Sequence, residues 1–455
     1  MRGCLMNNSN VNDSTIPLGD DVRKPTDNSL CLAWERGVNL WAEEAFRRMN
    51  TDESKVRSYT LPPIPDSLEE WESQKKELLQ TFKDCLYGEM PPPPDKVELE
   101  LLSEKKGALN GLALRREYRI YCRMNNGRSF DFDMLLYIPA GATAEKPVPV
   151  FEMLNFKGNQ CGVESEEIRP TRAPGQPAGR WHADEDNPQI KMWGDDYFTH
   201  AVKRGYAFAT VCYGEVFPDN LDGFRKSIFR LFYDDKDLRP DCEVSLPEIK
   251  EGYRRKIGAI SAWAWGYSRM LDALEQIDLI DASKCAIVGH SRLGKTVLWA
   301  GANDERFKLV CVNNSGNGGA ALSRRNFGET LSMLWLVRSN WFCDKMVRYA
   351  GLEDELPIDQ HQLVALTAPR AMCVASSSRD YTADPKGEFL AAYHGSKVWK
   401  LYGYDMLPGG GQMPEENCVI GNERIRYFVK TGVHSLTTYD FEQYFDFADS
   451  LFAEK

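Results

Sequence analysis

One short stretch of the sequence carries a side chain that could act as a nucleophile. Ser291 lies between Gly289 and Gly294. An apolar run at 285–288 precedes it and a helical pattern at 296–302 follows it. Flanking glycines let a strand turn sharply into a helix, and the helix N-terminus then offers N–H groups to an oxyanion. The second glycine stands one place later than in G-x-S-x-G, so this pattern alone leaves an ordinary strand-to-helix turn open.

A serine nucleophile needs a base, and the chain offers three histidines after Ser291: His361, His394 and His434. His434 follows a glycine in a loop just before the last helical pattern, at 439–452. His361 instead precedes a strand-like run, and His394 lies within a helical one. Where the chain order is serine, acid, histidine, the base is expected in such a late loop. The sequence predicts His434 as the base; a surface loop histidine is the alternative.

The base needs an acid to orient it, and Asp380 is well placed for this. It follows the apolar run 371–375 after a few polar residues. Asp384 comes four residues later and directly precedes Pro385, an arrangement typical of a helix N-cap. We therefore predict that Asp380 orients His434, while another carboxylate stays open as the acid; Asp384 could instead cap a helix that begins at Pro385.

The elements that must position these side chains alternate along the chain. Apolar, strand-like runs lie at 148–154, 207–213, 285–288, 309–313 and 371–375, with a helical pattern at 257–280. Such alternation predicts a parallel sheet with helices on both faces. The expected fold is α/β, an α/β-hydrolase built as a three-layer α/β/α sandwich with a mostly parallel central sheet. Functional residues should then lie on loops at the carboxyl ends of the strands, where long loops are expected at 155–195, 214–250, 314–365 and 402–433.

The N-terminal part follows a different pattern. Residues 1–30 are polar and are expected to be disordered. Helical patterns at 32–49 and 68–86 predict a helical extension over 31–95 that packs on the body. Strand-like runs at 97–102, 112–121 and 130–138 then open a catalytic domain over 96–455, with a hairpin turn predicted at Asn125-Asn126-Gly127.

Bulk properties exclude several classes of function. The net charge of −11 provides no basic surface for nucleic acid or an anionic membrane, and no apolar run is long enough to span a bilayer. The twelve cysteines contain no C-x-x-C pair and are interpreted as buried hydrophobes, without a disulfide or zinc framework. We expect no metal or organic cofactor, and a monomer. The first residues lack an apolar signal core, which leaves open a cytoplasmic protein or a leader absent from this chain.

The residues above stand within a series of motifs that resembles the glucuronoyl esterases, carbohydrate esterase family 15, particularly their bacterial branch. The resemblance runs from about Phe151 to the C-terminus. The pieces are Asn155-Phe156-Lys157-Gly158-Asn159, Tyr213-Gly214-Glu215, Trp263-Ala264-Trp265-Gly266, Gly289-His290-Ser291-Arg292-Leu293-Gly294-Lys295, Ser315-Gly316-Asn317-Gly318-Gly319, Arg324-Arg325-Asn326-Phe327-Gly328-Glu329, Asp359-Gln360-His361, Ala383-Asp384-Pro385-Lys386-Gly387-Glu388-Phe389 and Gly432-Val433-His434.

The resemblance implies hydrolysis of esters between 4-O-methyl-glucuronate on xylan and lignin alcohols, by a secreted or periplasmic enzyme. It implies a nucleophilic role for Ser291 and a base role for His434. Arg292 would help to hold the oxyanion, and Lys295 and Glu329 would contact sugar hydroxyls. Without the resemblance, these three charged residues would be interpreted as solvated surface charges.

Three positions depart from the family pattern. Many members carry the triad glutamate where this sequence has Asn314, although some bacterial members place the acid on the later loop, as with Asp380. Fungal members have a disulfide-bonded cysteine where this sequence has His290. A tryptophan that often packs on the sugar is replaced by Thr382, with Tyr381 adjacent.

Two other functions stay open at this point. A related hydrolase could remove acetyl groups from xylan, and a pseudoenzyme could keep the fold only to bind carbohydrate. The Ser291, His434 and Asp380 set favours an enzyme.

Overall fold

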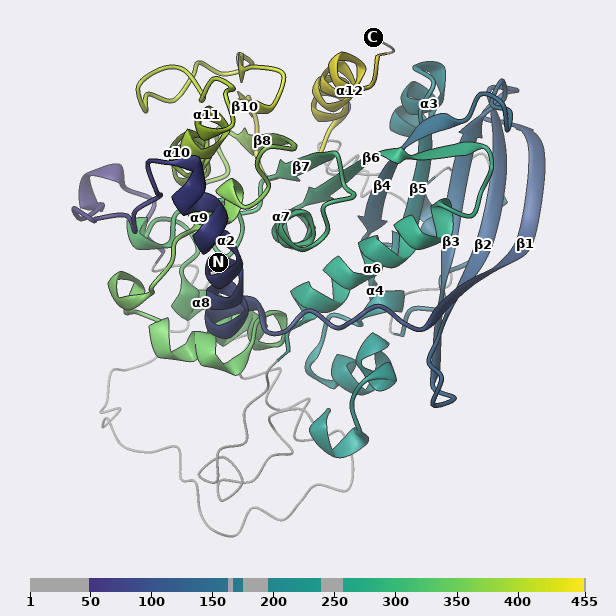
Figure 1. Ribbon diagram of the computed structural model, residues 1–455, viewed down its shortest axis with the longest axis horizontal. Helices are drawn as coiled ribbons and strands as arrows, with labels where there is room; N and C mark the ends of the chain where they lie inside the picture. Colours follow the sequence, from purple (N-terminus) through teal and green to yellow (C-terminus); the bar gives the residue numbers. More distant parts are fainter. Residues whose placement is uncertain (1–48, 163–166, 175–194, 239–256, 454–455) are drawn as a thin grey trace, which may run out of the picture.

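The computed structural model describes residues 49–162, 167–174, 195–238 and 257–453, and its centre is one ten-stranded sheet (Figure 1). The strands are β1 (Lys96–Ala108), β2 (Ala113–Arg123), β3 (Ser129–Pro139), β4 (Val148–Asn155), β5 (Ala207–Cys212), β6 (Ile280–His290), β7 (Leu309–Asn313), β8 (Ala371–Ser377), β9 (Val419–Gly421) and β10 (Ile425–Lys430). Their order is β1-β2-β3-β5-β4-β6-β7-β8-β10-β9. The six strands from β5 to β10 in this order are parallel to one another, while β1 to β3 and β9 pair antiparallel at the two edges.

Helices cover both faces of the sheet (Figure 1). On one face lie α3 (Asp195–Lys203) and α12 (Thr438–Phe452), whose rings Tyr197 and Phe441 stack at 4.6 Å. On the other face lie α6 (Ala259–Leu274) and α7 (Arg292–Asn303). Each face has its own cluster of buried apolar side chains. The predicted three-layer α/β/α sandwich of the α/β-hydrolase fold is confirmed.

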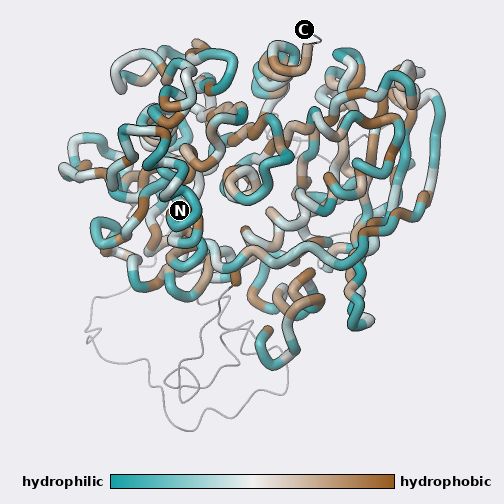
Figure 2. The backbone as a smooth tube through the Cα atoms, in the orientation of Figure 1, coloured by the Kyte–Doolittle hydropathy of each residue, from teal (hydrophilic) through white to brown (hydrophobic). Residues whose placement is uncertain are grey.

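The central strands are buried on both faces. Every residue of β5, β7 and β8 is buried, which explains why they appear in the sequence as continuous apolar runs (Figure 2). The hairpin predicted between β2 and β3 is confirmed, with Gly127 at φ 87° in its turn. This antiparallel edge extends the sheet beyond the strands that carry the candidate site.

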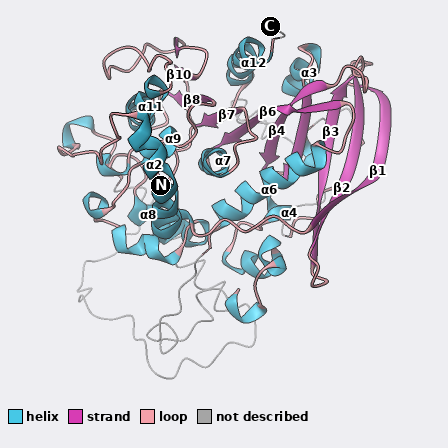
Figure 3. Cartoon of the chain, viewed as in Figure 1, coloured by secondary structure: helices cyan, strands magenta, loops and turns pink. Residues whose placement is uncertain are grey.

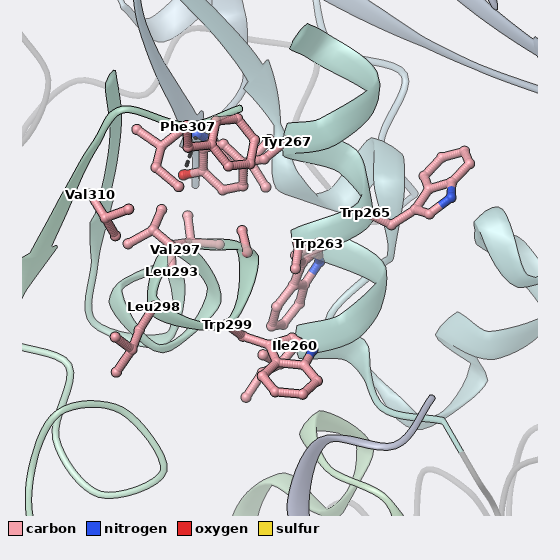
Figure 4. Close-up of a cluster of buried hydrophobic side chains, with 14 of the residues drawn as sticks. Ile260, Trp263, Trp265, Tyr267, Leu293, Val297, Leu298, Trp299, Phe307 and Val310 are labelled. Atoms are coloured by element: carbon pink, nitrogen blue, oxygen red, sulfur yellow. Dashed lines mark hydrogen bonds between the residues drawn. The ribbon is translucent and has the colours of Figure 1, made fainter. Parts of the chain in front are cut away.

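Packing between α6 and α7 fixes the helix that follows Ser291 (Figure 4). The hydroxyl of Tyr267 donates to the carbonyl of Val288 at 2.8 Å and accepts from the Leu154 N–H at 3.0 Å, which joins α6 to two strands. The Trp299 indole N–H donates to the Ser261 hydroxyl at 2.9 Å across the two helices. Because these contacts are buried, the start of α7 has little freedom to move.

The N-terminal helix α2 (Leu68–Phe82) continues into a π-helical turn at Lys83–Tyr87, so the helix predicted at 68–86 is confirmed. Tyr87 closes this segment onto the body: its hydroxyl donates to the Gly318 carbonyl at 2.9 Å, and its ring stacks on Trp299 at 4.4 Å. The predictions for residues 1–30 and for a helix at 32–49 lie outside the described residues, apart from residue 49. The domain limits at 30 and 95 stay predictions.

All four of the predicted long loops contain some regular structure, and two of them differ most from the prediction. The segment 402–433 contains β9 and β10, and its description as a loop is wrong there because β10 completes the parallel part of the sheet. The segment 314–365 is built from short helices (Figure 3). The remaining elements are η1 (Glu53–Lys55), η3 (Asn159–Cys161), α4 (Tyr213–Val216), η5 (Leu221–Lys226), η6 (Ile228–Leu231), η7 (Asp235–Asp237), η9 (Ser323–Arg325), α8 (Leu331–Arg338), η10 (Ser339–Trp341), η11 (Asp344–Tyr349), η12 (Glu353–Glu355), α9 (Gln360–Ala365), α10 (Pro385–Gly395) and α11 (Lys397–Leu401).

Within the described ranges, none of the helices has the length and apolar character that crossing a bilayer requires. Cys285, Cys311 and Cys373 are buried and free, as predicted from their apolar surroundings.

Candidate active site

Ser291 occupies the sharp turn between β6 and α7. Its backbone angles are φ 59° and ψ −128°, a strained conformation for a residue with a side chain. Its N–H donates to the Asn313 carbonyl at 2.9 Å, which holds the turn against β7. A Cβ atom on Gly289 would lie 2.0 Å from the Leu293 carbonyl, and one on Gly294 would lie 2.8 Å from that of Asn313. The second glycine is therefore required at 294, where α7 passes β7, and not at 293.

His434 and Asp380 form the pair that the sequence predicts. His434 follows β10, Asp380 follows β8, and the ring Nδ1 donates to Asp380 Oδ2 at 2.5 Å. Asp380 is 4% exposed, while the His434 ring opens to solvent. Nδ1 carries the proton in this contact, so Nε2 is free to act as an acceptor.

Asp384 does not take part in this pair. Its carboxylate accepts from the Gly387 N–H at 3.0 Å and thereby caps α10, as predicted. It also pairs with Arg325 at 2.8 Å, and Arg325 contacts Glu53 at 2.7 Å. Asp384 therefore stabilises the loop that bears Asp380.

Ser291 and His434 lie at the same edge of the sheet, because His290 precedes Ser291 and its ring centroid lies 4.5 Å from that of His434. The Ser291 hydroxyl makes no hydrogen bond to any of the described residues, His434 included. Contacts of this kind in free hydrolases often tighten only when substrate binds. The structure thus brings base and nucleophile to one place without closing the hydrogen bond between them.

Arg292, the first residue of α7, is held in place by Asp219. The two side chains form an ion pair, and Asp219 also accepts from the Trp341 indole N–H at 2.7 Å. The guanidinium lies over the rings of Trp341 and Phe156, at 5.0 and 5.6 Å from their centroids. Burial opposes its charge, but Asp219 outweighs burial and raises the pKa of Arg292 above its ordinary value. Arg292 is therefore a fixed cation beside Ser291, and no pattern in the sequence indicated Asp219 as its partner.

Lys295 and Glu329 also meet, in an ion pair between α7 and the segment before α8. The Lys295 side chain is 3% exposed, and its ammonium also donates to the carbonyls of Ser315 at 2.5 Å and Asn317 at 2.7 Å. Burial raises the pKa of Glu329, and Lys295 opposes that rise. The surface-charge interpretation of Lys295 is excluded by its burial.

A buried carboxylate that sequence reasoning passed over supports this part of the site. Glu388 on α10 is fully buried and accepts from the N–H groups of Ser315 and Gly316 at 2.5 and 3.0 Å. Its other oxygen accepts from the Ser376 hydroxyl at 2.6 Å. Burial raises the pKa of Glu388 to about 8. From the sequence alone, Glu388 could have been singled out only by its position in one of the family motifs.

The described residues contain no group of three or more His, Cys, Asp or Glu side chains placed to hold a metal ion. A strained serine on a strand-to-helix turn, a histidine hydrogen-bonded to a buried aspartate and a cation at the helix start together define the class. This is the arrangement of a serine hydrolase with the α/β-hydrolase fold.

Comparison with known proteins identifies the family within this class. A family model described as "Glucuronyl esterase, fungi" matches residues 252–403. A carbohydrate esterase, MZ0003, of an unknown prokaryotic organism is 36% identical over 450 residues, covering 91% of this chain and 94% of that protein. A 4-O-methyl-glucuronoyl methylesterase of Neurospora crassa is 33% identical and covers 39% of this chain and 50% of its own length.

The solved structure of a glucuronoyl esterase from Solibacter usitatus superposes with a TM-score of 0.73 at 35% identity, covering 88% of this chain and 99% of that one. This chain belongs to the glucuronoyl esterase family, carbohydrate esterase family 15, and is a carboxylic ester hydrolase.

Proposed function

We propose that this protein hydrolyses esters of glucuronate and 4-O-methyl-glucuronate, as in the linkages between lignin and glucuronoxylan, through an acyl-enzyme on Ser291. The observation that carries the proposal is the His434–Asp380 hydrogen bond of 2.5 Å beside the strained turn of Ser291. Family membership supports the choice of substrate. The proposal takes the active form to be a monomer.

In the first step, His434 Nε2 removes the proton of the Ser291 hydroxyl as this oxygen attacks the ester carbonyl. Asp380 fixes the Nδ1–H tautomer and stabilises the imidazolium that forms. The alcohol leaves with the proton from His434. Water then attacks the acyl-enzyme by the same route and releases the uronate. No cofactor takes part in these steps.

The tetrahedral oxyanion is stabilised at the start of α7. The N-terminus of α7 directly after Ser291 supplies backbone N–H donors for it, and Arg292 adds a positive charge held by Asp219. A preorganised donor of this kind lowers the activation barrier by roughly 3–4 kcal/mol. Because Asp219 and the two rings keep the guanidinium in place, little reorganisation is needed during the reaction.

Lys295 and Glu329 bind the sugar in this proposal. In the free protein, the three N–H donors of Lys295 already meet the carbonyls of Ser315 and Asn317 and the carboxylate of Glu329. A sugar hydroxyl that binds Lys295 must replace one of these acceptors, whereas Glu329 can accept a hydroxyl at its second oxygen. Lys295 therefore also orients Glu329.

The test compares turnover of benzyl glucuronate with that of an aryl acetate by the purified chain. The proposal expects a much higher kcat/KM for benzyl glucuronate and none with Ser291→Ala. Preference for the acetate would instead support the alternative of a carbohydrate deacetylase. If the wild-type protein hydrolyses neither ester and a serine-directed phosphonate does not label it, a carbohydrate-binding pseudoenzyme is the better description.

A further inference from the structure

A chain of buried polar groups runs behind the base, starting from the loop that carries His434. Lys430, the last residue of β10, donates to the Ser435 carbonyl at 2.6 Å and so ties together the two ends of this loop. Its ammonium also pairs with Asp440 at 2.5 Å. Asp440 in turn accepts from the Thr437 N–H at 2.7 Å and forms the capping box of α12. Lys430 is 4% exposed and Asp440 is fully buried, so the ion pair is shielded from solvent.

The same series of buried, hydrogen-bonded polar groups continues to the turn that carries Ser291. The Asn313 amide N–H donates to the second oxygen of Asp440 at 3.0 Å, and its amide oxygen accepts from His290 Nδ1 at 2.7 Å. The backbone carbonyl of Asn313 accepts the Ser291 N–H. Asn313 is thus hydrogen-bonded at once to the nucleophile's backbone, to the ring of His290 and to the helix cap beyond His434.

These contacts fix the tautomer of His290. Because the Asn313 N–H donates to Asp440 and also to the Tyr444 hydroxyl at 3.1 Å, its amide oxygen must face His290. His290 therefore carries its proton on Nδ1. Its Nε2 is buried and has no hydrogen-bond partner among the described residues.

The ring of His290 is also kept uncharged. It is 3% exposed, and burial lowers its pKa well below the ordinary value. His434, Lys430 and Arg292, which are positive when protonated, lower this pKa further, while the hydrogen bond to Asn313 opposes the shift. The Asp440 carboxylate lies on the far side of Asn313 and is paired with Lys430. The neutral ring lies against His434 with a centroid separation of 4.5 Å and a tilt of 43°. A cation at this distance would oppose protonation of His434, which catalysis requires.

We propose that His290 is a positioning residue for the catalytic base: its neutral ring, held in one orientation by Asn313, supports the His434 imidazole from the side of the sheet. This inference rests on the proposed role of His434. It explains how a histidine on an open loop keeps one orientation: the hydrogen bond to Asp380 holds Nδ1, and the ring of His290 packs against the imidazole. The role belongs to the side chain and is separate from the strain of the adjacent Ser291 backbone.

Two substitutions separate the parts of this role. His290→Phe keeps a ring against His434 but loses the hydrogen bond to Asn313. His290→Asn keeps a donor near Asn313 but removes the ring. We expect each to lower kcat for benzyl glucuronate at least tenfold and to slow phosphonate labelling of Ser291 in parallel, with KM changed less than twofold, because the sugar contacts at Lys295 and Glu329 are untouched.

His361 provides a matched control. It is as buried as His290, at 2% exposed, and likewise has one ring nitrogen in a hydrogen bond, here at 2.9 Å to the Pro62 carbonyl, and one without a partner among the described residues. His361→Phe should lower the melting temperature by about as much as His290→Phe and leave kcat and the labelling rate within twofold of wild type.

The outcomes distinguish this inference from the proposed function. If both His290 variants keep wild-type kcat and labelling while Ser291→Ala is inactive, the positioning role is wrong and the esterase mechanism stands. A measurement on the wild-type protein guards against variants that do not fold. In its ¹⁵N NMR spectrum, His290 should stay a neutral Nδ1–H tautomer over the whole pH range in which the enzyme is active. A His290 that takes up a proton over this range would overturn the inference.

Discussion

The ends of β7 and β8 lie side by side at the site, yet only one of them carries a charge. After β7 comes Asn314, where many relatives carry the triad glutamate; after β8 comes Asp380. The Asn314 amide donates at 2.9 Å to the same Asp380 oxygen that accepts from His434. A second carboxylate at this distance would be repelled by the first. The comparison shows that the end of β8 supplies the one carboxylate that meets His434, and that the neutral Asn314 at the end of β7 serves it as a hydrogen-bond donor.

The largest expected effect tests which strand end supplies the acid. Asp380→Asn should lower kcat by roughly 10³–10⁴-fold, because a neutral amide cannot stabilise the imidazolium and favours the wrong tautomer. Asn314→Ala removes only a supporting hydrogen bond and should lower kcat by about tenfold or less. Steady-state kinetics with benzyl glucuronate measure both. Small, comparable losses in the two variants would contradict Asp380 as the acid.

A swap of the two side chains sharpens the comparison further. Asn314→Glu combined with Asp380→Asn moves the carboxylate to the end of β7, where many relatives carry it. We expect kcat at least tenfold above that of Asp380→Asn alone, and below wild type, since the surrounding donors are arranged for Asp380. Asn314→Gln combined with Asp380→Asn is the matched neutral control. Equal kcat for the two double variants would show that only the end of β8 can serve the base.

A smaller effect comes from placing carboxylates at both strand ends. Asn314→Asp adds a negative charge near His434, which stabilises the imidazolium form over the neutral imidazole. Since His434 must be neutral to accept the serine proton, the acidic limb of the pH profile of kcat/KM should move to higher pH. The alkaline region should change little. A limb that moves to lower pH, or not at all, would mean that residue 314 is not electrostatically coupled to the base.

Much of this arrangement could be predicted from the sequence. The parallel strands are buried on both faces and therefore form continuous apolar runs. These runs predicted the fold and showed which candidate catalytic residues follow which strand. Ser291, His434 and Asp380 could be found because strand ends and turn residues mark their positions. β10 was missed because its alternating residues include Arg426 and Lys430, which break the apolar run that marks the other central strands.

The supporting groups could not be found in this way. Asp219 meets Arg292, and Asn313 meets His290 and Asp440, across long separations in the sequence. Each of these side chains is of a type that is usually solvated, so only its tertiary neighbours reveal a role. The same holds for Glu388, whose partners lie on the segment after β7 and on β8 itself.

The smallest expected effect concerns the spacing of the two strand ends, which Glu388 maintains by binding Ser315 and Gly316 after β7 and Ser376 on β8. Its pKa is raised from the ordinary 4.5 to about 8 by burial. Above about pH 4.5 the unfolded chain releases the carboxyl proton, while the folded state keeps it bound. The contribution of Glu388 to the free energy of unfolding is therefore fully present below that pH and is lost progressively as the pH rises through 8.

Glu388→Gln keeps the acceptor for Ser315 and Gly316 and cannot titrate. Its melting temperature should fall less than that of wild type between pH 5 and 9, with kcat at pH 6 reduced only a few-fold. Differential scanning calorimetry across this range measures the difference. Parallel curves for the two proteins would mean that the hydrogen bonds donated to Glu388 keep it ionised, and that the strand ends are held by a buried charge in place of a neutral acid.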